Sequence, residues 1–321
     1  MLNNGRKLGA FIVPTGVGAS IGGFAGDASV WARKLSEKCS LIVNPNVVNA
    51  ACFSGINENM FYVEGYSLDR FFKGECNLIP SSDNKIGVVF DKSISQEVLN
   101  VHINTINAVK TVYGIDVIGY EITEQPVGVE FYVDKSGISM GDVKNLLAVK
   151  KASEKLIKRG ADSIAIVCSF PEDDGEDYAN GIGVDPVGGV EAIISHYISK
   201  ELNVPCAHAP AFENIQISTE LVDSRCSAEY ITPTFLPCIL IGLSKAPKLS
   251  NKGGININDL DFLVMPYNCL GGIPVFEMKK LGKPIYAIKE NKTILNVLTN
   301  KININCIEVD TYQNLIDTIL S

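Results

Sequence analysis

The strongest constraint on the fold of this chain is the repeated alternation of short, wholly apolar segments with longer amphipathic ones. Apolar segments rich in valine and isoleucine predict strands that are buried on both faces, and amphipathic segments predict the helices that cover them. The expected strands are 8–14, 40–43, 85–90, 116–120, 163–167, 238–243, 262–265, 285–288 and 306–309. The expected helices are 27–38, 96–113, 141–159, 189–202, 275–281, 292–298 and 312–320. This alternation indicates an α/β fold whose mostly parallel sheet is flanked by helices.

The chain is long enough for one large domain or for two domains of ordinary size. It has 321 residues, of which 46% are hydrophobic, and this is enough apolar material for a full core. A weak boundary near 125–160 predicts an N-terminal α/β half at 1–140, which contains a glycine-rich loop, and a C-terminal α/β half at 141–321. We expect the two halves to pack intimately. The polar stretch 172–180 is expected to be a surface loop or a lid over a cleft.

The composition excludes several classes of partner. The formal net charge is −8 and lysine and arginine form no cluster, so we expect no nucleic-acid partner. The apolar runs are shorter than the roughly 20 residues that span a bilayer, so we expect no membrane partner. The opening residues, MLNNGRKLGAFIVPTG, lack the long apolar region and the cleavage site of a secretory signal, so none is expected.

The nine cysteines indicate free thiols. Their number is odd and none forms a C-x-x-C pair, which removes the zinc-finger and thioredoxin interpretations. Several lie in apolar runs, where a free thiol behaves as a small hydrophobic group. Free thiols fit a reducing compartment, and we therefore expect a cytoplasmic protein.

A glycine-rich loop is the strongest chemical signal in the sequence. The segment TGVGASIGGFAGD follows an expected strand and leads into an expected helix, so its backbone N–H groups are candidates for cradling a phosphate or carboxylate. A dinucleotide site would need an acidic residue at the end of the second strand, but Asn44 and Asn46 stand there, and no Walker A lysine is present. Close packing of the helix on the sheet remains an alternative role for the glycines, and the cofactor stays unknown.

Two other glycine pairs precede helices, and we expect all three pairs to converge on one cleft whose helix N-termini attract an anion. Polar residues that follow strands should meet at the same edge of a parallel sheet, although turn capping is the alternative for each asparagine. Arg70 could clamp a carboxylate, or it could belong to a surface helix packed by aromatic residues. The candidate substrate-binding residues are Thr15, Gly16, Gly18, Gly22, Gly23, Asn44, Asn46, Arg70, Gly188, Gly189, Asn268, Gly271, Gly272 and Asn291.

Three residues are candidates for acid–base catalysis. His208 lies in a segment flanked by prolines, Asp185 precedes an expected helix, and Glu290 follows an expected strand. A histidine needs only a neighbouring carboxylate to act as a general acid or base. A metal site from Asp185, His196 and His208 lacks a supporting spacing, so we expect no metal, and His196 is expected to be structural.

Cys168 and Cys269 each follow an expected strand and suggest a second type of enzyme. In the aspartate/glutamate racemase superfamily, two cysteines in pseudo-symmetric halves remove and return a proton, and the placement here is loosely similar. A cysteine at a strand end is more often inert, so we expect Cys168 not to be an essential nucleophile or base.

Several segments resemble the domain-of-unknown-function family 3326. They include PTGVGASIGGFAGDA, YVEGYSLDRFFKGE, GVDPVGGVEAIISH and VPCAHAPAF, and the similarity extends from about residue 8 to 297. This family has no assigned reaction, so the resemblance implies an identity without a mechanism. It also implies that the glycine loops and the histidine segments belong to one functional unit.

Together these features predict an enzyme of small-molecule metabolism that binds an anionic or amide-bearing substrate at glycine-rich strand-end loops. Hydrolysis, isomerisation and group transfer all remain open, and the sequence is compatible with a homo-oligomer. The alternatives are a non-catalytic protein that binds or senses a small ligand, and a cysteine-dependent, racemase-like enzyme. Convergence of Asp185, His208 and Glu290 would favour an enzyme.

The thiol prediction can be checked directly by mass spectrometry. Protein that is unfolded and alkylated without prior reduction should carry a modification on every one of its nine cysteines. A stable pair of unmodified cysteines would reveal a disulfide and contradict the expectation.

Overall fold

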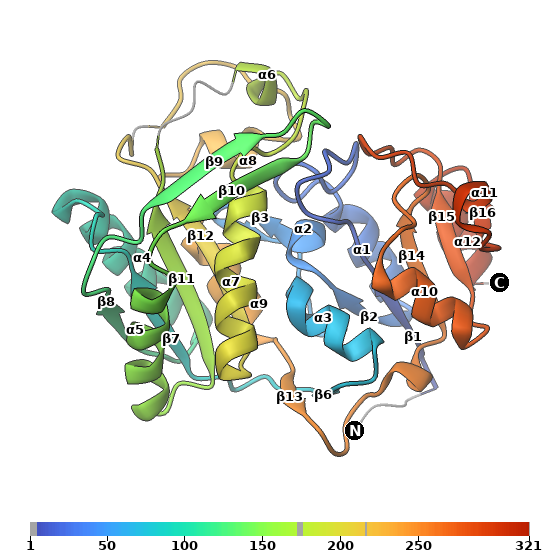
Figure 1. Cartoon of the computed structure of the whole chain (residues 1–321), viewed down its shortest axis with the longest axis horizontal. Helices are drawn as coiled ribbons and strands as arrows, with labels where there is room; N and C mark the ends of the chain where they lie inside the picture. Colours follow the sequence, from blue (N-terminus) through green and yellow to red (C-terminus); the bar gives the residue numbers. More distant parts are fainter. Residues whose placement is uncertain (1–4, 172–175, 216, 321) are drawn as a thin grey trace.

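The computed structural model describes residues 5–171, 176–215 and 217–320, and it contains two parallel sheets that lie side by side (Figure 1). The larger sheet has the strand order β16-β15-β14-β1-β2-β5 and the smaller sheet has the order β12-β11-β7-β8. The six strands of the larger sheet are β1 (Lys7–Phe11), β2 (Cys39–Val43), β5 (Met60–Tyr62), β14 (Phe262–Pro266), β15 (Ile285–Ile288) and β16 (Ile307–Val309). The smaller sheet consists of β7 (Ile86–Phe90), β8 (Val117–Ile122), β11 (Ser163–Ser169) and β12 (Cys206–Ala211). The predicted α/β fold is confirmed.

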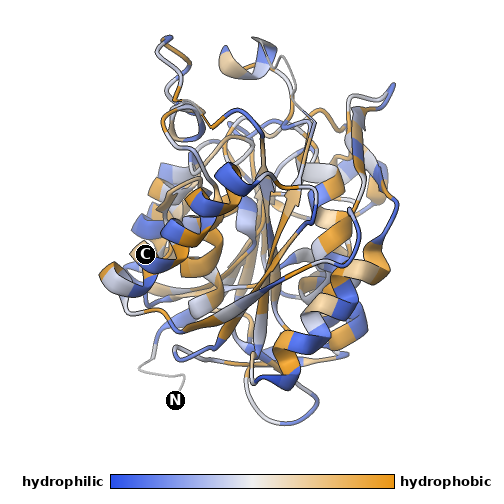
Figure 2. Ribbon diagram, turned by 90° about the vertical axis from the view of Figure 1, so that its left-hand side faces the viewer, coloured by the Kyte–Doolittle hydropathy of each residue, from blue (hydrophilic) through white to orange (hydrophobic). Residues whose placement is uncertain are grey.

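Helices cover both sheets, and Figure 2 shows apolar strands between helices that turn polar faces outward. The helices are α1 (Ser29–Ser36), α2 (Pro45–Val48), α3 (Gly65–Phe72), α4 (Gln96–Tyr113), α5 (Leu146–Lys158), α6 (Glu176–Ala179), α7 (Gly188–Leu202), α8 (Ser227–Tyr230), α9 (Leu236–Ser244), α10 (Ile273–Lys280), α11 (Thr299–Ile302) and α12 (Tyr312–Leu320). Every residue of β7 and of β14 is buried, as expected for strands covered on both faces. In the part of the chain that the structure describes, no helix is long and apolar enough to cross a membrane.

One hydrophobic cluster joins the two sheets into a single core. It contains Phe11 and Val43 from the larger sheet, Val88 and Val167 from the smaller sheet, and Leu240 from α9. The two sheets therefore pack intimately, and each of them contains strands from both 1–140 and 141–321. The chain forms the first three strands of the larger sheet, crosses to the smaller sheet, and returns for β14, β15 and β16.

Short antiparallel pairs complete the fold. The hairpin of β9 (Val129–Val133) and β10 (Ser139–Val143) packs against α7, and β6 (Asn77–Ile79) pairs with β13 (Lys248–Ser250). A further pair joins β3 (Asn49–Ala50) to β4 (Phe53–Ser54). The division expected between 140 and 141 stays a prediction about folding units, and it falls within β10.

Two expected elements are wrong. The segment 238–243 lies in α9 rather than in a strand, because a short continuous apolar run has no periodicity to separate a buried helix from a buried strand. The segment 292–298 is irregular, and the next helix along the chain is the short α11. Part of the stretch 172–180 lies outside the described residues, and α6 forms within the rest. All nine cysteines are free, as expected.

Candidate functional site

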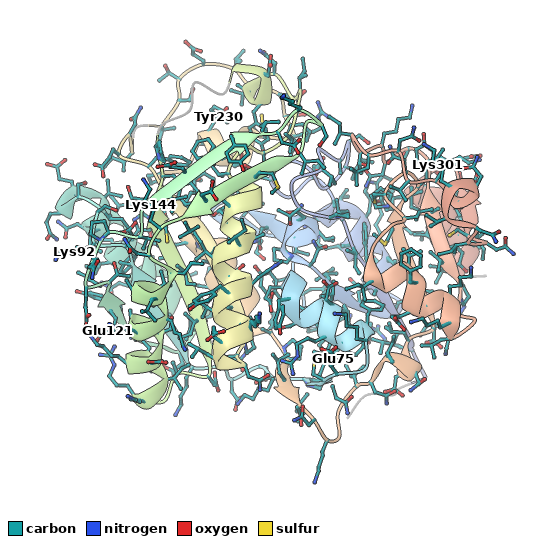
Figure 3. The ribbon with its side chains drawn as sticks, viewed as in Figure 1. Glu75, Lys92, Glu121, Lys144, Tyr230 and Lys301 are labelled. Atoms are coloured by element: carbon teal, nitrogen blue, oxygen red, sulfur yellow. The ribbon has the colours of Figure 1, made fainter. Side chains whose placement is uncertain are left out.

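Two adjoining cavities open where the two sheets meet. An inner cavity of about 100 Å³ lies among the loop that follows β1, the start of α7 and the strand β12. An outer cavity of about 550 Å³ lies beside it and is lined partly by Tyr230, which Figure 3 labels. Six residues line both cavities: Tyr178, Asp185, Glu191, Pro210, Glu229 and Phe235. A small chamber and a larger one therefore share an acidic wall.

The inner cavity brings together about half of the residues singled out from the sequence. These are Thr15, Gly16, Gly18, Gly22, Gly23, Asn46, Asp185, Gly188 and His208. The others lie outside both cavities: Asn44, Arg70, Gly189, Asn268, Gly271, Gly272, Glu290 and Asn291. Gly22, Gly23 and Gly188 therefore meet at one cavity, whereas Gly271 and Gly272 lie at the start of α10.

Three buried asparagines use their amide groups to tie loops together. Asn44 accepts from the Val13 N–H at 3.0 Å and donates to the Val13 carbonyl at 2.7 Å. Asn291 holds the Ile21 N–H and carbonyl in the same way, at 2.9 and 2.7 Å. Asn268 donates to the Thr293 carbonyl at 2.7 Å. The backbone already occupies these amides and none of the three residues lines either cavity, so their contact with a ligand stays a prediction.

Two charged candidates also serve structural contacts. A carboxylate oxygen of Glu290 accepts from the Tyr312 N–H at the start of α12, so this side chain caps a helix and does not meet His208. Arg70 donates to Asn203 Oδ1 at 2.6 Å and lies outside both cavities. Neither residue is positioned for the role expected from the sequence.

The glycines of the first loop serve its tight turn. Gly22 has a φ of +82°, and a Cβ atom there would lie 2.9 Å from the Val13 side chain. A Cβ atom on Gly23 would lie 2.1 Å from the Ala19 carbonyl oxygen. The Gly22 N–H donates to Asp27, so an acidic side chain already occupies a donor that the anion cradle would need.

The N-terminus of α7 is also matched by side chains of the protein itself. Asp185 accepts from the Val187 N–H at 3.0 Å, and Ser139 Oγ accepts from the Gly189 N–H at 3.0 Å. A carboxylate at a helix N-terminus complements the helix dipole. Donors that would otherwise attract an anionic ligand are therefore already paired.

His208 is the best-positioned catalytic candidate. It lies on β12, and its Nδ1 is 2.8 Å from Ser195 Oγ on α7. Its Nε2 is 3.9 Å from Glu191 Oε2, which is also on α7. Burial lowers the pKa of His208 to about 3, so the imidazole is neutral at ordinary pH.

The acidic wall beside His208 holds protons that carboxyl groups normally release. Burial, together with the charges of Asp185 and Glu229, raises the pKa of Glu191 well above its usual range. Burial likewise raises the pKa of Glu229 to about 8 and raises the pKa of Asp185. Tyr178 forms a hydrogen bond with Glu229. Burial also raises the pKa of the neighbouring Asp27 to about 6. The site thus combines a neutral imidazole with two carboxyl groups, Glu191 and Glu229, that keep their protons at neutral pH.

Sequence reasoning found His208 and Asp185 but did not select Glu191 or Glu229. Glu191 and Ser195 stand four positions apart on α7, so they share one helical face, and that spacing was a usable signal. Glu229 lies in the short helix α8 and carries no comparable pattern.

The two cysteines of the racemase-like alternative do not meet. Cys168 is the last residue but one of β11 in the smaller sheet, and Cys269 follows β14 of the larger sheet. Both are buried in separate clusters outside the two cavities, and burial raises the pKa of each thiol. Among the described residues, no three histidine, cysteine or acidic side chains are arranged to hold a metal ion.

Comparison with known proteins gives a family without a reaction. The family model "Protein of unknown function (DUF3326)" matches residues 9–321. A protein of Synechococcus sp. (strain ATCC 27144 / PCC 6301 / SAUG 1402/1), named "Uncharacterized lipoprotein syc1174_c", is 38% identical over 304 residues, which is 91% of this chain and 84% of that protein. No solved structure matches the chain.

The lipoprotein name of this relative contradicts the expected cytoplasmic location. Free thiols and a mixed composition describe the folded body of a protein, and attachment of a lipid leaves both unchanged. Cysteine usage therefore does not fix the compartment of this protein.

The amide of Asn291 should contribute measurably to stability. Replacing it with alanine leaves the Ile21 N–H and the Tyr312 hydroxyl without their buried partner. We expect Asn291→Ala to lower the free energy of unfolding by about 2–4 kcal/mol in denaturant titrations. The exposed Asn100 on α4 provides a control, since Asn100→Ala should change stability by less than about 0.5 kcal/mol. Equal effects of the two substitutions would contradict the bridging role.

Removing the carboxyl group of Glu229 should stabilise the protein at alkaline pH. Between pH 4.5 and about 8 the folded chain keeps a proton on Glu229 that the unfolded chain releases. The free energy of unfolding contributed by this group therefore falls as the pH rises through that window. We expect Glu229→Gln to be more stable than wild type by about 1–3 kcal/mol at pH 8, and nearly unchanged at pH 4.5.

Denaturant titrations at both pH values measure this difference. Glu154→Gln on the outer face of α5 is the matched control and should behave as wild type at both. A greater stabilisation by Glu229→Gln at acid pH would show that Glu229 is ionised in the folded chain.

Proposed function

The chain belongs to the DUF3326 family, and we propose that it is an enzyme of small-molecule metabolism that transfers protons on a substrate held in the inner cavity. His208 is the base and Glu191 is the acid. The observation that supports this proposal is that His208 is fixed at one ring nitrogen by Ser195 and faces Glu191 with the other.

The distances suit proton transfer through a bound molecule. The 3.9 Å between His208 Nε2 and Glu191 Oε2 exceeds a direct hydrogen bond, so a substrate group or a water that contacts both atoms would sit to one side of the pair, toward the cavity. Ser195 holds the ring in place, because its hydroxyl lies 2.8 Å from Nδ1. An oriented base with one free nitrogen is what general base catalysis requires.

The protonation states divide the roles. The neutral imidazole has a free lone pair and can take a proton, whereas the protonated carboxyl group of Glu191 can give one. Isomerisation and hydrolysis both proceed by such paired proton transfers. The His208–Glu191 pair therefore suits these two reactions better than it suits group transfer.

A non-catalytic binding or sensing protein is the second candidate. The size of the outer cavity, about 550 Å³, favours it, because a protein that only binds needs room and contacts rather than an oriented base. The two candidates differ in whether the bound molecule is changed.

Turnover of a metabolite mixture, followed by mass spectrometry, tests the proposal. We expect wild-type protein to convert at least one component, and His208→Gln and Glu191→Gln to lower that rate by about 10²–10⁴-fold. His196→Gln is the matched control, because His196 lies on α7, 3.9 Å from Glu64, but outside both cavities. It should retain the wild-type rate.

Binding without conversion would favour the sensing protein. Conversion that survives His208→Gln at the wild-type rate would overturn the assignment of the base.

A further inference from the structure

Among the residues that the structure describes, the wall shared by the two cavities has acidic groups and no lysine or arginine. Asp185, Glu191 and Glu229 all line both cavities, and Asp27 lies close enough to influence Glu229. The guanidinium of Arg225 lies nearby, but it donates to Asp223 at 2.9 Å and to the Gly181 carbonyl at 2.8 Å. Arg225 therefore does not neutralise the carboxyl groups of the wall, which stay available as hydrogen-bond acceptors.

One of these acceptors is buried and unpartnered. Glu191 is 6% exposed, and its Oε1 atom makes no hydrogen bond within the described residues. A buried oxygen without a donor costs free energy, and such atoms normally have a partner. The partner that fits an oxygen in this acidic wall is an N–H group that carries positive charge.

We propose that the substrate carries a protonated basic nitrogen, as an ammonium or amidinium group, held by Glu191, Asp185 and Glu229. This rests on the proposed function and names the class of its substrate. It replaces the anionic ligand expected from the glycine loops, because the N–H groups of Gly22 and Gly189 are already paired within the protein.

An organic cation suits this wall better than a metal ion does. Within the ranges that the structure describes, the acidic and histidine side chains form no cluster arranged to ligate a metal. A nitrogen cation needs only acceptors in several directions, without the fixed distances of metal coordination.

The remainder of the substrate would occupy the outer cavity. Phe212, Phe235 and Tyr230 contribute aromatic surface there, and Ser218 and Thr232 contribute hydroxyl groups. Such a wall accepts an apolar or aromatic body with a few polar substituents. An amine attached to an aromatic frame is therefore a suitable probe.

Binding of such a cation should depend on pH. The charge that holds it appears only when a carboxyl group of the wall releases its proton, and Glu229 holds its proton up to about pH 8. Affinity should therefore rise with pH below that value, by up to about tenfold per pH unit for one proton released. The titratable and charged groups that face Glu229 and Glu191 are Asp27, Cys168, Tyr178, Asp185, His208, Cys226 and Cys238. Arg225 faces Asp27 and Cys226 in turn.

The test uses three probes of one shape and different charge: 2-phenylethylamine, 2-phenylethanol and 3-phenylpropanoate. Each is titrated into the intact chain, and binding is followed by thermal shift and by ligand-observed NMR. We expect the amine alone to bind, with an affinity that rises at least tenfold from pH 6 to pH 8. Glu229→Gln should weaken amine binding at pH 8 by tenfold or more and flatten its pH dependence. Glu154→Gln, on the exposed face of α5, should leave both unchanged.

Three outcomes would overturn the inference: binding of the alcohol or the carboxylate as tightly as the amine, an equal response to magnesium chloride, or no binding of the amine at any pH. The metabolite assay separates this failure from that of the proposed function. If turnover depends on His208 but the amine does not bind, only the proposed substrate class is wrong. Absence of both would remove the enzyme as well.

Discussion

Parallel pairing of strands is the constraint on which the site depends. A parallel sheet places every loop that follows a strand at one edge, and here two such sheets are joined by a common core. The loop after β1, the start of α7 and β12 therefore meet at the inner cavity although they are far apart in sequence. Helix α7 completes the arrangement, because its start lines the cavity while one of its faces turns Glu191 and Ser195 toward His208.

The same constraint explains why sequence reasoning located residues better than it assigned their roles. Apolar runs predicted the strands of the two sheets except β5 and β12, and the positions after β1 and β2 correctly pointed to Thr15 and Asn46 at the cavity. Asn291 also follows a strand, yet it holds the Ile21 backbone at 2.9 Å. An asparagine that binds a ligand and one that replaces backbone hydrogen bonds look alike in sequence, since the side chain offers the same donor and acceptor to either.

Helix α9 and the role of Glu229 could not be predicted from the periodicity of the sequence. All but two residues of α9 are buried, so its apolar run has no polar face to mark the helical repeat. Glu229 acquires its raised pKa only from burial and from Asp185 and Asp27, which the fold brings beside it. The raised pKa of Glu229 therefore depends on tertiary contacts, and the sequence around α8 gives no sign of it.

Burial of several acids in one wall creates a conflict that a bound cation resolves. Without a cation, the carboxyl groups avoid mutual repulsion by keeping their protons, which lowers stability at pH values where an exposed carboxylate is ionised. A cation against Asp185 and Glu229 would favour their ionised forms and so lower the pKa of both carboxyl groups. Glu191, whose pKa burial and the charges of Asp185 and Glu229 raise well above its usual range, would keep its proton and accept a hydrogen bond from the cation through Oε1. The charge that holds the substrate and the proton that catalysis needs would therefore reside on different carboxyl groups of the same wall.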